Sequence, residues 1–128
     1  LYITLPAPNE EVYLRTCRPL IADGWKRLTR SLELISSFSC NTVIRLTLVK
    51  ELNMVKPEEY GELIAKYEPN YVEVKSFMSV GFARERLPYE AMPLHEQIRR
   101  FAERIAETCG YRIRDEQRES RVVLLAKR

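Results

Sequence analysis

Two charged side chains, Glu73 and Lys75, stand two positions apart in the stretch YVEVKS. Val72 and Val74 alternate with them, and this period of two is typical of a β-strand with one apolar face. The segments around it indicate a parallel sheet covered by helices, in which strands are usually apolar on both faces. A carboxylate and an ammonium group are therefore unexpected on such a strand. Binding of a charged substrate would explain their presence.

The preceding strand-like stretch, NTVIRLTLVK, carries polar residues in the same way, with Arg45 and Thr47 between apolar neighbours. If the apolar residues of both strands lie under helices, these two side chains share the opposite face with Glu73 and Lys75. Opposite charges on adjacent strands could then pair, which offsets much of the cost of burying them. Equally, Arg45 and Glu73 could form a buried strut that only holds the strand register.

Three strands are expected near residues 1–5, 43–50 and 71–75, because short runs of apolar and β-branched residues occur there. Apolar residues that recur every three or four positions predict helices between and after these strands. The expected helices lie within residues 7–17, capped by Asn9, at about 25–36 behind Asp23, at 57–68 and at 94–110, and residues 111–128 close the chain as a strand pair.

Strands and helices that alternate in this order are the pattern of a parallel α/β sheet. An open doubly wound sheet and a barrel share that pattern. A barrel strand turns one face to the helices and the other to the lumen, and a lumen that binds a polar substrate can hold charged residues. The half-polar strands therefore favour a barrel.

The composition is that of an ordinary globular protein, with 128 residues, 45% of them hydrophobic and 30% charged. This length suits one domain or part of one. No apolar run is long enough to span a membrane and no signal-peptide pattern opens the chain, so we expect a cytoplasmic protein without membrane contact. The chain opens within a strand and without an initiator methionine, which suggests a piece of a longer protein.

The three cysteines, Cys17, Cys40 and Cys109, lie far apart and form no CxxC pair. Neither a disulfide framework nor a metal site closed by this chain is expected. The net charge of +3 is small, but the excess of basic residues lies entirely after residue 83. That distribution weakly favours a polyanionic partner such as nucleic acid, although solvated helix faces often look the same.

Four stretches together resemble one family of enzymes. RLTLVKELNM, VEVKSFMSVG, MPLHEQIRRFAERI and RDEQRESRVVLL occur in the order and spacing of the tRNA 4-demethylwyosine synthases, the radical S-adenosylmethionine enzymes of wyosine and wybutosine biosynthesis. The archaeal branch fits best. LYITLPAPNEEVYLRTCRPL also resembles that family, so the likeness covers nearly the whole chain.

The resemblance implies a fold and an activity. Family members are six-stranded partial TIM-type (β/α)6 barrels that use a 4Fe-4S cluster to cleave S-adenosylmethionine to a 5'-deoxyadenosyl radical. The radical activates pyruvate, and two pyruvate carbons close a third ring on N1-methylguanosine beside the anticodon of phenylalanine tRNA (tRNA-Phe). The product is 4-demethylwyosine, and the enzyme is a carbon–carbon lyase.

This sequence differs from the family in one important feature. The cluster motif CxxxCxxC, whose cysteines bind the iron–sulfur cluster, is absent. In family members these cysteines, and the lysine implicated with pyruvate, lie upstream of the matching segment. We therefore expect residues 1–128 to be the C-terminal half of the catalytic barrel, with strands four to six and a C-terminal strand pair. This segment should hold no metal ligand and should be inactive by itself, and the enzyme is expected to be a monomer.

The resemblance also assigns roles at the strand ends, where barrel chemistry is located. On the first two strands, Thr4, Thr47 and Lys50, with Asn53 just beyond, are the candidate contacts of the S-adenosylmethionine cosubstrate. Asn53 could instead serve a turn that leads into the next helix.

Glu73 and Lys75 end the third strand and are the candidate catalytic residues, placed to meet pyruvate or the target base. Lys75 could bind a carboxylate of a substrate or simply pair with one of the protein. In the following loop, Arg84 and Arg86 are candidate tRNA contacts, to phosphates or to a base. His95, at the start of the last helix, joins them as a neutral hydrogen-bonding group.

Two other functions fit parts of the pattern. One is a different radical S-adenosylmethionine enzyme on the same barrel, which the combination of motifs argues against. The other is a non-catalytic RNA-binding α/β module. A CxxxCxxC motif upstream of this segment would support an enzyme, and its absence would support the module.

Overall fold

A computed structural model of the protein describes residues 1–17, 22–78 and 91–127. Its strands form one mixed sheet in the order β1-β2-β3-β5-β4. The first three run parallel, and β5 lies antiparallel between β3 and β4. The strands are β1 (Tyr2–Thr4), β2 (Val43–Leu48), β3 (Tyr71–Ser76), β4 (Arg112–Gln117) and β5 (Val122–Ala126).

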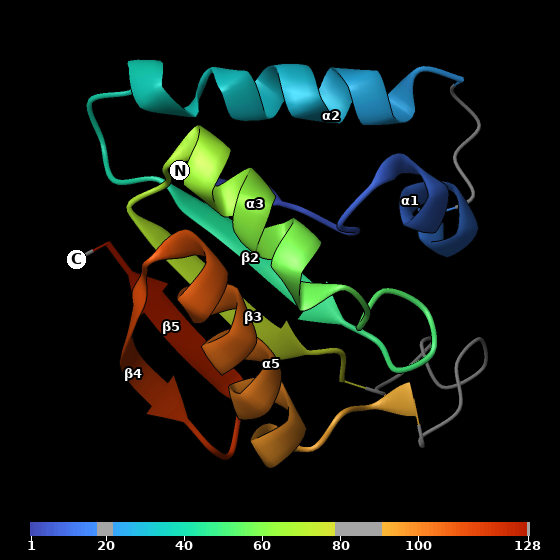
Figure 1. Ribbon diagram of the computed structural model, residues 1–128, viewed down its shortest axis with the longest axis vertical. Helices are drawn as coiled ribbons and strands as arrows, with labels where there is room; N and C mark the ends of the chain where they lie inside the picture. Colours follow the sequence, from blue (N-terminus) through green and yellow to red (C-terminus); the bar gives the residue numbers. More distant parts are fainter. Residues whose placement is uncertain (18–21, 79–90, 128) are drawn as a thin grey trace.

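Helices cover one face of this sheet. Figure 1 shows α3 and α5 side by side across the face, with α2 beyond α3 and α1 near the edge where the parallel strands end. The helices are α1 (Glu10–Cys17), α2 (Gly24–Glu33), the short 3-10 helix η1 (Ile35–Ser37), α3 (Pro57–Tyr67) and α5 (His95–Cys109).

The core lies between the sheet and these helices. Ile44, Leu46, Val72 and Val74 are fully buried, and they alternate with half-buried polar residues along β2 and β3. Helices α3 and α5 approach closely at Gly61, where a Cβ atom would lie 2.6 Å from Thr108 Cβ. The hydrophobic effect of this layer therefore holds the helices against one face of the sheet.

The helix ends match the expectation with two exceptions. One of them is α2, which ends at Glu33 and is followed by the 3-10 helix η1, whereas a single helix was expected to reach residue 36. Asn9 Oδ1 accepts the Val12 N–H at 2.9 Å, which caps α1. Gly110 ends α5 with φ at 77°, a left-handed conformation that glycine adopts without a Cβ penalty. Asp23 was expected to cap α2 but makes no side-chain cap; instead its carboxylate pairs with Arg27 one turn on.

The expected α/β class with parallel strands is confirmed, and the expected C-terminal strand pair is present as β4 and β5. None of the helices in residues 1–17, 22–78 and 91–127 combines the length and apolar character that crossing a membrane requires.

Candidate functional site

The polar side chains of β2 and β3 share the face of the sheet that the helices leave uncovered. The valines of β3 are fully buried under the helices, whereas Glu73 and Lys75 between them are half-buried on the other side. The parallel register places Arg45 beside Glu73 and Thr47 beside Lys75. The division into an apolar and a charged face, expected from the alternation, is confirmed.

Arg45 and Glu73 form the ion pair that the sequence led us to expect. Arg45 Nε donates to Glu73 Oε1 at 3.1 Å. The guanidinium also lies over the Tyr2 ring of β1, 4.5 Å from the ring centroid, which is within the range of a cation–π contact. Two neighbouring strands therefore hold Arg45 in place.

Lys75 has no carboxylate oxygen within 4.0 Å of its Nζ among the residues that the structure describes. It borders a hollow of about 580 Å³ on the uncovered face. Pockets for small molecules usually measure roughly 300–1,000 Å³, so the hollow has room for a substrate. Its lining residues are Tyr2, Glu73, Lys75, Asp115, Glu116, Gln117, Ser120, Val122 and Leu124.

Six of the nine residues that line this hollow come from β4, β5 and the turn between them, where sequence reasoning assigned no site residue. Since β5 lies beside β3, its Val122 and Leu124 adjoin the charged residues of β3. Strand β4 then adds Asp115 beside Leu124 and Gln117 beside Val122. The sequence VVLLA is apolar throughout, so it does not indicate which residues face the hollow, and the strand that pairs with β5 depends on the whole sheet.

Asn53 is enclosed, with 2% of its surface exposed. Its Oδ1 accepts the Val49 N–H at 2.7 Å, and its Nδ2 donates to the carbonyl oxygens of Thr47 at 2.9 Å and Pro6 at 3.0 Å. Both amide hydrogens are thus used by the backbone. The geometry favours the turn that was the alternative for this residue over a direct contact with a cosubstrate.

The other candidate cosubstrate contacts lie where a ligand can reach them. Thr4 is exposed and stands beside Arg45 on the uncovered face. Thr47 is half-buried on the same face. Lys50 follows β2, and its backbone N–H donates to the Ala91 carbonyl at 2.9 Å, which ties this strand end to the segment before α5.

His95 is buried at the first position of α5, with 6% of its surface exposed. Neither ring nitrogen makes a hydrogen bond to a residue that the structure describes, although Nε2 lies 3.6 Å from a carboxylate oxygen of Glu116 on β4. Arg99 hydrogen-bonds the same carboxylate and holds the pKa of Glu116 below its ordinary value. This enclosure favours a role in holding α5 against β4 over direct contact with RNA.

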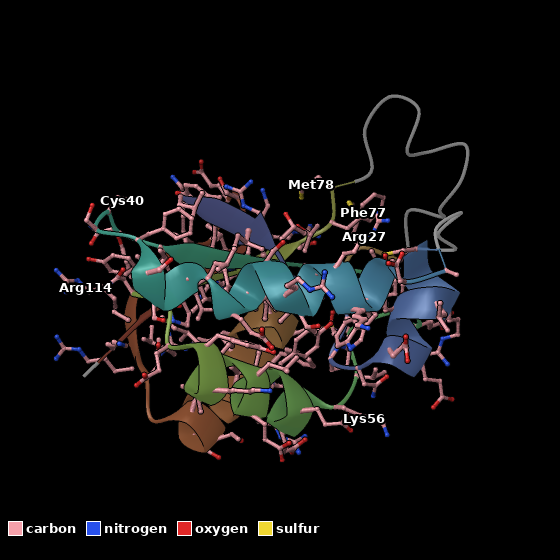
Figure 2. The ribbon with its side chains drawn as sticks, turned by 90° about the horizontal axis from the view of Figure 1, so that it is seen from above. Arg27, Cys40, Lys56, Phe77, Met78 and Arg114 are labelled. Atoms are coloured by element: carbon pink, nitrogen blue, oxygen red, sulfur yellow. The ribbon has the colours of Figure 1, made fainter. Side chains whose placement is uncertain are left out.

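The candidate tRNA contacts Arg84 and Arg86 lie outside the described residues. Phe77 and Met78, which precede that part of the chain, mark the edge at which β3 ends. In Figure 2 these two lie at the opposite end of the molecule from Cys40 and Arg114.

The cysteines do not fit an iron–sulfur cluster. Cys17 ends α1 and Cys40 precedes β2, both exposed, while Cys109 ends α5 and is partly buried. Within the described parts of the chain, no three His, Cys, Asp or Glu side chains gather as metal ligands would. A cluster needs three or four thiolates at one place, so these residues cannot hold one.

Comparison with known proteins shows what the chain resembles. A family model described as wyosine base formation matches residues 66–127. The S-adenosyl-L-methionine-dependent tRNA 4-demethylwyosine synthase of Pyrococcus horikoshii is 47% identical over 128 residues, which cover 99% of this chain and 37% of that protein. This chain is therefore similar, over nearly its whole length, to one part of a tRNA 4-demethylwyosine synthase. The resemblance inferred from the sequence motifs is confirmed.

Other tRNA 4-demethylwyosine synthases and two solved structures show the same similarity. The rice enzyme is 34% identical over 99% of this chain and 20% of its own length. A solved structure described as TYW1 with a lysine-pyruvate adduct bound superposes with a TM-score of 0.88 and 30% identity, covering 99% of this chain and 40% of that one. Archaeal TYW1 gives a TM-score of 0.78 at 25% identity, over 99% and 39%. The chain spans well under half the length of each.

Proposed function

We propose that this chain is the C-terminal part of the catalytic barrel of a tRNA 4-demethylwyosine synthase. The enzyme would condense pyruvate with N1-methylguanosine beside the anticodon of tRNA-Phe. The observation that carries the proposal is the match to the TYW1 structure with a lysine-pyruvate adduct, which extends over 99% of this chain at a TM-score of 0.88. The charged, uncovered face of the sheet supports it, because the lumen of a barrel would present such a face.

The two cofactors would be bound by different parts of the barrel. A 4Fe-4S cluster would be held by cysteines outside these residues, since Cys17, Cys40 and Cys109 do not come together. Thr4 and Thr47 offer hydroxyl groups on the uncovered face, where they fit the polar parts of S-adenosylmethionine. When bound, that cosubstrate supplies the one-electron chemistry.

Glu73 and Lys75 are the residues we assign to the reacting groups. Lys75 presents an ammonium group to the hollow without a carboxylate partner in the described chain, which suits the carboxylate of pyruvate. Glu73 is oriented by Arg45 and borders the same hollow. The two charges lie on β3 two residues apart, so both meet one ligand in the lumen.

The tRNA would approach the edge at which β1, β2 and β3 end. The proposed contacts are Arg84 and Arg86, which follow β3 in the chain. His95 begins α5 with its imidazole enclosed beside Glu116, so its proposed role is to hold α5 against β4. A cytoplasmic, monomeric lyase is part of this proposal.

The decisive experiment compares Lys75→Ala with Lys26→Ala in the enzyme that contains this segment and a reconstituted cluster. Lys26 is an exposed lysine on α2, away from the hollow, and serves as the matched control. Lys75→Ala should reduce product formation at least roughly tenfold, with unchanged tRNA affinity and melting temperature. The control should keep full activity.

The results separate the alternatives. If the wild type and the Lys26→Ala control form product and Lys75→Ala does not, the result supports both the synthase activity and the role assigned to Lys75. Tight tRNA binding by a wild type that never forms 4-demethylwyosine would point to an RNA-binding module. Reductive cleavage of S-adenosylmethionine with a different product would point to another radical enzyme on this barrel.

A further inference from the structure

The side of the hollow built by β4, β5 and their turn combines an apolar floor with polar groups. Val122 and Leu124 of β5 are half-buried and form the floor. Asp115 and Gln117 of β4 stand beside them, and Ser120 of the turn completes the rim. The proposed reaction assigned none of these five residues a role.

Hydrogen bonds within this rim fix its donors and acceptors. Ser120 Oγ donates to Gln117 Oε1 at 2.8 Å, so the amide group is oriented and its two Nε2 hydrogens have no acceptor in the described chain. Asp115 Oδ1 accepts the backbone N–H of Glu116 at 2.8 Å, which leaves Oδ2 as an acceptor. Glu116 of β4 also borders the hollow, but its carboxylate already accepts a hydrogen bond from Arg99. The acceptor and the donors that remain for a ligand are the Asp115 carboxylate and the Gln117 amide group.

These groups are placed to meet one flat ligand. Asp115 and Gln117 lie on the same face of β4, about 6.8 Å apart along the strand, and both side chains are long enough to reach toward one another over a ring. An apolar floor below such a pair suits an aromatic ring, because stacking leaves the polar edge of the ring free for hydrogen bonds. Phosphate fits poorly, since the carboxylates of Glu73 and Asp115 border the hollow and would repel it.

We propose that this part of the hollow is a subsite for a guanine-type base of the RNA substrate. A guanine ring carries an amino group and a carbonyl oxygen on one edge. Asp115 accepts a hydrogen bond from the amino group, Gln117 donates to the carbonyl oxygen, and Leu124 supports the ring. The inference rests on the proposed function, because it requires that RNA enters the lumen.

The test uses the enzyme that contains this segment and three anticodon stem-loop RNAs. They carry guanine, N1-methylguanine or hypoxanthine at the target position, and hypoxanthine lacks only the amino group of guanine. Binding is measured by fluorescence anisotropy at one salt concentration. The wild type should bind both guanine-type RNAs roughly tenfold more tightly than the hypoxanthine RNA, because hypoxanthine cannot donate the hydrogen bond to Asp115.

Asp115→Ala should abolish this preference by weakening binding of the guanine-type RNAs to the level of the hypoxanthine RNA. Gln117→Met removes both amide donors at a similar size and without adding a charge, so it should weaken binding of all three RNAs by roughly three- to tenfold, since each carries the carbonyl. Glu119→Ala removes a neighbouring carboxylate of the same turn that does not border the hollow, and it should keep the wild-type preference. A merely structural role of Asp115 would lower the melting temperature without moving the ratio between RNAs.

An unchanged preference in Asp115→Ala together with unchanged binding in Gln117→Met overturns the subsite. If product still forms in both variants, the proposed function stands without it. If the wild type neither binds these RNAs nor forms product, both proposals fail. If Asp115→Ala does not fold, Gln117→Met decides alone, because it keeps the size and the neutral charge of the side chain.

Discussion

Arg45 on β2 and Glu73 on β3 lie directly opposite each other in the parallel register, with 3.1 Å between Nε and Oε1. The Glu73 side chain is 18% exposed and that of Arg45 is 37% exposed, so the pair is only partly screened by water. Because the guanidinium also covers the Tyr2 ring, the pair links β1, β2 and β3 on the uncovered face. Any ligand in the hollow meets a carboxylate whose orientation is already set.

The first prediction concerns the strength of this pair. In a double-mutant cycle with Arg45→Met and Glu73→Gln, the coupling free energy should be about 1 kcal/mol, because the charges are partly desolvated and well aligned. The measurement is the free energy of unfolding in urea for the wild type, the two single variants and the double variant.

The matched control is the Asp23–Arg27 pair on α2, which has the same 3.1 Å separation but stands in solvent. Its cycle, built in the same way, should give a smaller coupling that salt removes, whereas the Arg45–Glu73 coupling should persist in salt. Equal couplings for the two pairs would show that partial burial adds nothing here.

The second prediction concerns Asn53. Asn53→Ala should destabilise the protein by about 2 kcal/mol, since it leaves the buried Val49 N–H and two partly buried carbonyl groups without their partner. Asn41→Ala, at an exposed asparagine before β2, should change stability by less than about 0.5 kcal/mol. A stable Asn53→Ala protein that fails only in binding S-adenosylmethionine would restore Asn53 as a cosubstrate contact.

The strands and helices of this fold could be predicted from the sequence because each has a strong local signal. Valines alternate along β3, and Asn9 and Gly110 sit where a cap and a left-handed C-cap are needed. The pairing of Arg45 with Glu73 followed from the same alternation. These features depend on neighbours within a few residues, or on strands adjacent in the chain.

What the sequence did not reveal depends on contacts between distant segments. The contribution of Asp115 and Gln117 to the hollow requires β5 to lie beside β3, and Gly61 is needed because α3 and α5 touch at Thr108. The burial of His95 depends in the same way on β4. Propensity and periodicity contain no information on these long-range neighbours.

The third prediction follows from the contact of Arg99 with Glu116. The pKa of Glu116 is lowered, chiefly because Arg99 hydrogen-bonds the carboxylate. The unfolded chain therefore binds this proton more readily than the folded protein does. The contact stabilises the protein above the unfolded-state pKa of about 4.3, and this contribution is lost as the pH falls through the lower, folded-state pKa.

The check compares melting temperatures of the wild type and Glu116→Gln between pH 7 and pH 3. The wild type should be the more stable protein at neutral pH, and the difference should shrink as the solution becomes acidic. Glu119→Gln, at an exposed carboxylate of the neighbouring turn, should follow the wild type throughout. A difference that stays constant over the whole range contradicts a lowered pKa at Glu116.

The last prediction concerns the proposed tRNA contacts Arg84 and Arg86. Replacing both by Ala should weaken tRNA binding, and the slope of log affinity against log salt should flatten by roughly 0.7–0.9 for each phosphate that is no longer neutralised, because fewer counterions are released. Cleavage of S-adenosylmethionine in the absence of tRNA should persist, since the arginines are assigned to the RNA and not to the cosubstrate.

Arg112 and Arg114 on β4 provide a matched control, because they have the same spacing and Arg114 lies at the end of the molecule opposite Phe77 (Figure 2). Replacing these two by Ala removes the same charge, so any effect of net charge alone appears equally in both double variants. A specific contact is shown only by a larger decrease of affinity and slope in the Arg84, Arg86 variant. If that variant binds tRNA like the control at every salt concentration, the segment after β3 does not contact the RNA and the proposed approach of tRNA to this edge must be given up.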